Sequence, residues 1–107
     1  MTQRGDLVAV SLPGDFGKPR SALVIQSDLL AELGSVVLCP VSSDLRTAAF
    51  RVTVEPRPGS GLRASSQVVV DKLSTLARAE LSAPFGRLED EQMKAVDKAL
   101  LLVVGLI

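Results

Sequence analysis

The segment that organises this chain reads KPRSALVIQSD and spans residues 18–28. Its centre, residues 22–25, is a short uninterrupted run of apolar side chains, which is typical of a strand covered on both faces. Arg20 stands just before that run, at the end of a loop that contains two prolines and two glycines. We expect its guanidinium to be partly shielded from water, and its planar fork matches two oxygens of a phosphate group. The alternative is an ordinary solvated arginine that pairs with Asp15 or Asp28.

Length and charge indicate one domain over residues 1–107 without an overall electrostatic field. A domain of this size buries about 65% of the surface that its unfolded chain exposes. The formal net charge is zero, so any binding to nucleic acid requires a local basic patch. One candidate patch contains Glu55 as its only acid. The patch consists of Arg46, Arg51, Arg57 and Arg63.

Histidine is absent, and Cys39 is the only cysteine. Without histidine the chain lacks the commonest acid–base side chain and the commonest metal ligand, so we expect no metal and no other cofactor. Cys39 lies in the apolar stretch 36–41, where we expect a small buried thiol. The polar N-terminus is unlike a signal peptide, and the apolar stretch 99–107 is too short to span a bilayer. We therefore expect a soluble, cytoplasmic protein that binds no membrane.

Short apolar segments separated by turn residues predict many short strands. We expect them at residues 6–12, 20–26, 35–41, 48–55 and 66–71, with further short ones at 73–76 and 83–88. Alternation within 48–55 places Phe50 in the core and Arg51 on the solvated face. Residues 89–91 are acidic and favour the start of a final helix. The apolar face of this helix consists of Met93, Val96, Ala99, Leu100 and Val103.

These elements predict an α+β fold that is mostly β. We expect a small, barrel-like sheet of strongly curved antiparallel strands, covered by the C-terminal α-helix. One helix face cannot cover all of the apolar side chains near the C-terminus. The remainder consists of Leu101, Leu102, Val104, Leu106 and Ile107. Small proteins usually bury such a surplus against another chain, so we expect a homodimer.

Five segments together resemble one protein family, in its order and over nearly the full length. They are RGDLV (4–8), RSALVIQSD (20–28), LCPVSS (38–43), SQVVVDK (66–72) and GRL (86–88). The chain resembles the MazF/PemK/Kid toxins of bacterial type II toxin–antitoxin systems, which share their fold with the gyrase poison CcdB. The resemblance implies a dimer of SH3-like barrels that cleaves single-stranded mRNA at specific sequences without a metal. It further implies 2′,3′-cyclic phosphate and 5′-hydroxyl ends, and inhibition by a cognate antitoxin.

The resemblance also implies the catalytic residues. Arg20 matches an arginine that serves proton transfer and phosphate stabilisation, and Ser42 occupies the position of a Ser or Thr that contacts the same phosphate. Asp71 aligns with an acid that some members use near the scissile group. The chain departs from the family at Ser21, where members usually have proline, and at Val69, where some have a basic residue.

The chemistry of RNA cleavage agrees with this set but leaves the proton transfers open. The reaction needs a base for the 2′-hydroxyl, charge stabilisation of the phosphorane and an acid for the leaving 5′-oxygen. Arg20 suits stabilisation and Ser42 adds a neutral donor, whereas an arginine pKa above about 12 makes a poor base. Asp71 or water could therefore take part. The alternatives are a plain strand-terminating turn at residues 42–44, and a turn-capping role for Asp71.

RNA binding is expected from phosphate contacts, hydrogen bonds to base edges and one aromatic platform. Bases commonly stack on aromatic side chains, and Phe16 in the first loop is the expected platform. The predicted RNA-binding residues are Phe16, Lys18, Ser43, Arg46, Arg51, Arg63 and Lys72. Two other functions compete: a gyrase poison that acts through its C-terminal helix, and an inactive protein-binding barrel. Such poisons end in a tryptophan-containing segment, and this chain has no tryptophan.

Overall fold

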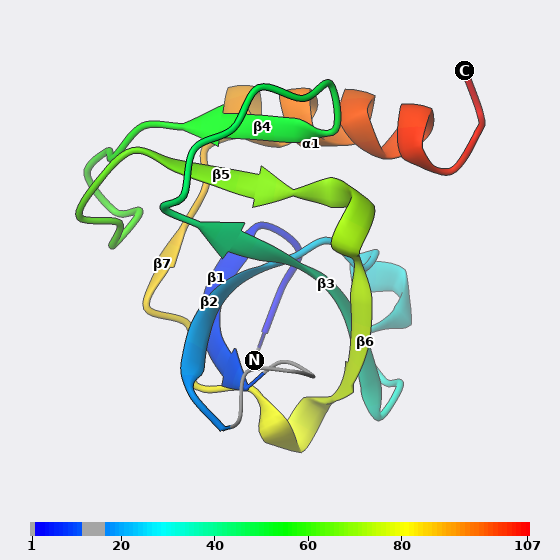
Figure 1. Cartoon of the computed structure of the whole chain (residues 1–107). Helices are drawn as coiled ribbons and strands as arrows, with labels where there is room; N and C mark the ends of the chain where they lie inside the picture. Colours follow the sequence, from blue (N-terminus) through cyan, green and yellow to red (C-terminus); the bar gives the residue numbers. More distant parts are fainter. Residues whose placement is uncertain (1, 12–16) are drawn as a thin grey trace.

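The computed structural model describes residues 2–11 and 17–107, which form a curled antiparallel sheet and a C-terminal helix (Figure 1). The strands are β1 (Asp6–Ser11), β2 (Pro19–Val24), β3 (Ser35–Ser42), β4 (Arg51–Val54), β5 (Ser66–Val69), β6 (Ser74–Ala77) and β7 (Gly86–Arg87). Short 3-10 helices are η1 (Asp28–Leu30), η2 (Val70–Lys72) and η3 (Arg78–Glu80), and helix α1 spans Asp90–Val103. The expected α+β, mostly β fold with strongly curved strands is confirmed as a half-barrel.

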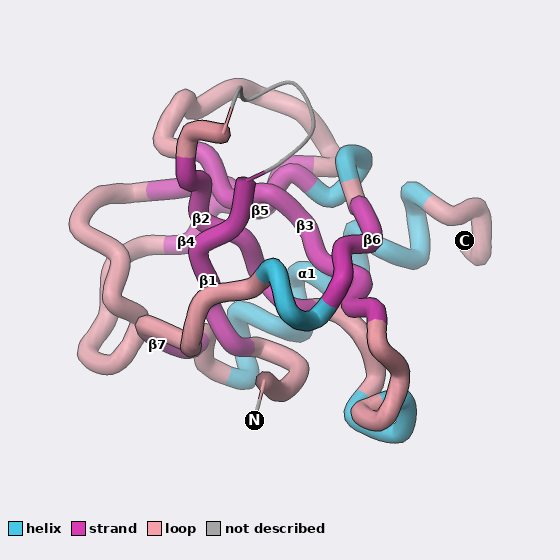
Figure 2. The backbone as a smooth tube through the Cα atoms, turned by 90° about the horizontal axis from the view of Figure 1, so that it is seen from below, coloured by secondary structure: helices cyan, strands magenta, loops and turns pink. Residues whose placement is uncertain are grey.

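Strand β3 lies at the centre of the curled sheet and has different partners along its length. The strand order is β4-β5-β3-β2-β1-β7, and β6 pairs with β3 outside this path. The first half of β3 pairs with β6 over Ser35–Leu38, and its last two residues pair with β5. Figure 1 shows β1, β2, β3 and β6 curving around one interior, while β4 and β5 continue toward α1. Seen from below in Figure 2, the chain crosses from β6 to β7 at the near end of this curl.

Neighbouring residues of the central strands belong to two different hydrophobic clusters. Leu7 and Leu23 lie in the cluster that α1 covers, together with Cys39 and Val96. Val8 and Ala22, each next to one of these leucines, lie in the cluster inside the curl. Successive side chains of a strand point to opposite faces, so these strands are covered on both. The prediction for the apolar run 22–25 is confirmed.

Helix α1 follows its predicted pattern. Met93, Val96 and Ala99 are buried, and Leu100 and Val103 pack against the same cluster. A capping box between Glu89 and Gln92 begins the helix. Gly105, with φ +80°, follows its end, as expected of a residue past a helix C-terminus. Within the described residues, no helix is long and apolar enough to cross a membrane.

Several predicted strands have other bounds in the structure: the one expected at 20–26 ends at Val24, and the one expected at 83–88 is only Gly86–Arg87. The strand expected at 48–55 begins only at Arg51, because the Arg51 N–H donates to the Ala48 carbonyl and forms a turn. This turn leaves Phe50 outside the strand and 36% exposed, so its predicted core position is wrong. The strand expected at 66–71 ends at Val69, and Asp71 belongs to η2 instead.

Candidate active site

The pairing of β2 with β3 brings the two principal predicted residues together. Ser21 pairs with Val41 in this antiparallel register. One further step in the same register brings Arg20 opposite Ser42, at the end of the strand pair. Side chains of directly opposite residues lie on the same face of a sheet. The register therefore brings Arg20 and Ser42, which are far apart in the sequence, to the same edge of the half-barrel.

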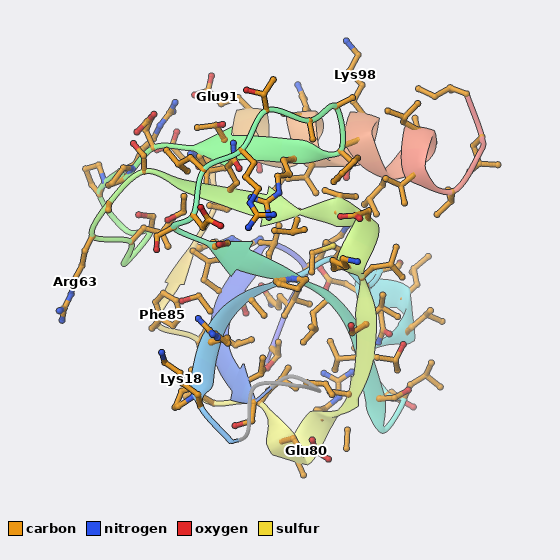
Figure 3. All side chains as sticks on the ribbon, viewed as in Figure 1. Lys18, Arg63, Glu80, Phe85, Glu91 and Lys98 are labelled. Carbon is orange, nitrogen blue, oxygen red and sulfur yellow. The ribbon has the colours of Figure 1, made fainter. Side chains whose placement is uncertain are left out.

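A groove of about 1110 Å³ opens at this edge and contains most of the predicted site. The predicted residues that line it are Arg20, Ser42, Ser43, Arg46, Arg51, Arg63, Asp71 and Lys72. Lys18 is exposed but is not among the lining residues. Figure 3 shows Arg63 extending away from the body of the protein at the rim. Phe16 lies outside the described residues.

The groove is cationic although the whole chain is neutral. Among the described residues that line it, five are arginine or lysine and two are aspartate. Such an excess of one sign in a concave surface attracts an anionic ligand. The arrangement therefore supplies the local basic patch that nucleic-acid binding requires in a chain of zero net charge.

Arg57, the remaining member of the predicted basic patch, is not among the groove-lining residues. Its Nη1 donates to Glu91 and, at 2.8 Å, to Glu89 near the start of α1. These two hydrogen bonds raise the pKa of Arg57. The side chain is thus paired with two carboxylates of the helix, and its assignment to one patch with Arg46, Arg51 and Arg63 is wrong.

Ser42 is the last residue of β3, and a hydrogen bond fixes the direction of its hydroxyl group. Its oxygen accepts a hydrogen bond of 3.0 Å from the Asp44 N–H, so residues 42–44 form the strand-terminating turn that the sequence also allowed. A hydroxyl that accepts one hydrogen bond keeps its own proton for donation. The turn and the predicted donor role are therefore compatible.

Gln67, which no sequence pattern singled out, positions the arginines of the groove wall. This side chain is 6% exposed. Its Oε1 accepts hydrogen bonds of 2.9 Å from both the Arg46 N–H and Arg51 Nη1, while its Nε2 donates to the Arg46 carbonyl and the Thr53 hydroxyl. Arg51 also donates to the Asp44 carbonyl at 2.7 Å. The one signal in the sequence was an amide side chain directly before a run of three valines.

Asp71 lies where η2 reaches the groove, close to the buried thiol of Cys39. Burial and, secondarily, the negative charge of Asp71 raise the pKa of Cys39 to about 12. A buried thiol with a raised pKa has little thiolate character, as is typical of a structural cysteine. Its predicted burial is confirmed, with no exposed surface. Within the described residues, no three Asp, Glu or Cys side chains are grouped so that they could hold a metal ion.

Phe85 is a second lining residue that sequence reasoning missed. It precedes β7, is 42% exposed and shares the groove with Arg20 and Arg63. The sequence gave it no distinguishing pattern, since a phenylalanine between Pro84 and Gly86 is equally typical of a buried turn.

Comparisons with known proteins agree with this fold. Residues 3–104 match the family described as the PemK-like, MazF-like toxin of type II toxin–antitoxin systems. A probable endoribonuclease MazF from Mycolicibacterium smegmatis is 36% identical over 106 residues, which cover 97% of each chain. An endoribonuclease in complex with its cognate antitoxin, from a mycobacterial species, superposes with a TM-score of 0.87 at 21% identity, over 100% of this chain and 98% of that one. A Mycobacterium tuberculosis MazF toxin gives 0.80 at 23% identity, over 94% and 96%.

The two structural likenesses establish the fold. The family match and the relative from M. smegmatis extend over nearly the whole chain. The chain therefore belongs to the PemK-like, MazF-like toxins of type II toxin–antitoxin systems and is an endoribonuclease.

Proposed function

We propose that this endoribonuclease binds single-stranded mRNA in the cationic groove and cuts it at specific sequences. The phosphodiester that is cut would be held by Arg20 and Ser42. The observation that carries the proposal is the β2–β3 register, which aligns these two residues at the groove. A guanidinium fork and a hydroxyl donor on one face suit a phosphodiester, because both non-bridging oxygens then have partners. The expected end products are a 2′,3′-cyclic phosphate and a 5′-hydroxyl.

In the proposed reaction the 2′-oxygen attacks phosphorus and the bond from phosphorus to the 5′-oxygen breaks. The 2′-hydroxyl loses one proton and the leaving 5′-oxygen gains one. Arg20 stabilises the negative charge of the phosphorane, and the Ser42 hydroxyl donates to one of its oxygens. Asp71, which lines the same groove, or a water molecule accepts the first proton. The scheme uses no metal ion.

The other cationic side chains of the groove are proposed to hold the RNA backbone. Arg51 begins β4 and Lys72 ends η2. Although they belong to different elements, both residues line the groove. Arg46, Arg63 and Lys18 extend the positive surface toward its rim. Contacts of this kind position single-stranded RNA through its phosphates, while base edges carry the sequence information. Cleavage of mRNA places the action of the toxin in the cytoplasm.

Two protein partners belong to the proposal. A toxin of this family is paired with an antitoxin by definition, and an acidic segment of that antitoxin would block the cationic groove. The second partner is another copy of the chain. Exposed apolar side chains at the end of α1 support a homodimer. They are Leu101, Leu102, Val104, Leu106 and Ile107.

The test is cleavage of single-stranded RNA by the purified protein in the presence of EDTA. We expect cutting by the wild type and a loss of at least about 100-fold in Arg20→Ala, because a charge-stabilising donor contributes about that much to the rate. Arg57→Ala is the matched control, since it removes an arginine outside the groove and is expected to cut normally. Intact RNA at micromolar wild-type protein, together with inhibition of gyrase, would instead support the poison.

A further inference from the structure

We propose that Phe85 is a stacking platform for one unpaired base of the bound RNA. The inference rests on the proposed function, because it assumes that RNA lies in the groove. Phe85 lines the same groove as Arg20 and Ser42, and it is not one of the RNA-binding residues predicted from the sequence.

The exposure and the position of the ring carry the first step. Phe85 is 42% exposed, and the groove that it lines also contains Arg20, Ser42 and Arg63. Among the described residues it is the only aromatic side chain that lines this groove. Figure 3 shows Phe85 on the same side of the molecule as Arg63 and Lys18. An exposed aromatic ring among cationic side chains matches a polyanion that carries flat bases.

The backbone beneath the ring is fixed by hydrogen bonds and close packing. The Phe85 N–H donates to the Leu7 carbonyl of β1 at 2.9 Å, and the Arg87 N–H donates to the Gly59 carbonyl at 2.9 Å. A Cβ atom on Gly61 would lie 2.7 Å from Cδ1 of Phe85, so the ring rests directly against this glycine. A platform held from both sides loses little conformational freedom when a base stacks on it.

The loop behind the ring is equally constrained. A Cβ atom on Gly86 would lie only 1.9 Å from the Ser60 carbonyl oxygen, which shows how closely the two segments pack. The Ser60 hydroxyl is buried and accepts hydrogen bonds from the N–H groups of Arg57 and Leu62. The groove wall at Phe85 is therefore a preformed surface.

The chemistry of the ring selects the part of RNA that it contacts. A phenylalanine ring has no donor for a phosphate or a ribose hydroxyl, but its face stacks on any base. Arg20 and Arg63, which line the same groove, can supply phosphate partners for the nucleotides next to such a base. An interface with a second protein chain would also cover the ring, and the experiment below distinguishes that outcome.

The test uses Phe85→Trp as a fluorescent reporter. The chain contains no tryptophan and no tyrosine, so the new indole is the only strong fluorophore. The probe is a 2′-O-methyl RNA octamer, which lacks the attacking hydroxyl, and the comparison ligand is an abasic oligonucleotide of equal length. We expect the RNA to quench the indole strongly and the abasic ligand to leave it nearly unchanged. Equal quenching by both ligands, or by neither, would overturn the proposal.

Phe50→Trp is the matched control, because Phe50 is also partly exposed but lies in a smaller adjoining hollow with Arg46 and Arg51. We expect a weaker difference between the two ligands there. Phe85→Leu supplies a second measurement that needs no bulkier ring against Gly61. It should weaken binding of the octamer about fivefold or more, as loss of one stacked base does, and leave binding of the abasic ligand unchanged.

The outcomes separate this inference from the proposed function. Unchanged RNA binding by Phe85→Leu, with cleavage that still depends on Arg20, would overturn the platform and leave the nuclease assignment intact. Wild-type protein that neither binds nor cuts RNA would overturn both. Unchanged RNA binding by Phe85→Leu, together with dissociation of a dimer, would assign the ring to a protein interface instead.

Discussion

Two segments flank β4, residues 43–50 before it and residues 55–65 after it, and each accompanies an arginine that the structure fixes in place. Arg51, which follows the first segment as the first residue of β4, donates to the neutral oxygens of the Gln67 amide and the Asp44 backbone. Arg57, in the second, donates to the carboxylates of Glu89 and Glu91. A neutral acceptor orients a guanidinium and leaves its charge unbalanced, whereas a carboxylate cancels it. Of these two arginines, Arg51 is therefore the one expected to serve an anionic ligand.

The largest expected effect comes from detaching the second segment. In Gly86→Ala the new methyl group would lie 1.9 Å from the Ser60 carbonyl oxygen, so the segment must move away. We expect the free energy of unfolding to fall by about 3 kcal/mol, at the upper end of the usual cost of overpacking. Urea denaturation followed by circular dichroism measures it. Gly34→Ala is the control, because nothing lies within 4 Å of the added atom. Equal midpoints for the two variants would show that the segment is loosely held.

The second largest effect is expected when the Gln67 amide, the neutral acceptor of the Arg51 guanidinium, is removed. Gln67→Leu leaves the Arg46 backbone and the Arg51 guanidinium without their buried partner, which costs about 2 kcal/mol of stability. We expect RNA cleavage by the folded variant to fall about tenfold, because a misplaced arginine weakens backbone binding by about one charge-assisted hydrogen bond. Gln92→Leu is the matched control: this glutamine is equally buried but serves the start of α1. Equal cleavage by the two variants would contradict a positioning role for Gln67.

The smallest effect compares the two arginines directly. The slope of the logarithm of RNA affinity against the logarithm of salt concentration should become shallower by about 0.7 in Arg51→Ala, the value for one phosphate contact on a single strand. Arg57→Ala should leave the slope unchanged, because its charge is already balanced by Glu89 and Glu91. Fluorescence anisotropy with the 2′-O-methyl octamer at several salt concentrations measures both. A shallower slope in Arg57→Ala would remove the distinction between the segments.

Sequence patterns predicted most of the fold because they report local burial. The double-sided apolar run 22–25, the face of α1 and the buried Cys39 were all predicted from the sequence, and the structure confirms them. Phe50 was misplaced because the alternation in residues 51–54 continues backward across a turn that has no marker residue. A pattern of period two shows which residues share a face, but it does not show where the strand begins.

The site was harder to predict, because its members come from different strands. Arg20 and Ser42 come to one edge through a register that only the paired strands define, so the sequence pattern suggested Arg20 alone and Ser42 entered through the family resemblance. The separation of Arg51 from Arg57 depends on tertiary partners that follow much later in the chain, Gln67 for one and Glu89 for the other. Charge counted along the sequence cannot distinguish them, since both lie in the same basic stretch.

Asp44 forms an ion pair with Arg46 in the groove, so its carboxylate competes with an RNA phosphate for this arginine. One carboxylate oxygen accepts from both Nε and Nη2 of the arginine, at 3.0 and 2.8 Å, and both side chains are largely exposed. An exposed pair of this kind contributes at most about 1 kcal/mol, so an incoming phosphate displaces it readily. Added salt weakens the attraction of Arg46 to the Asp44 carboxylate and its attraction to a phosphate alike. Arg46 should therefore exchange one anion for another at nearly constant charge.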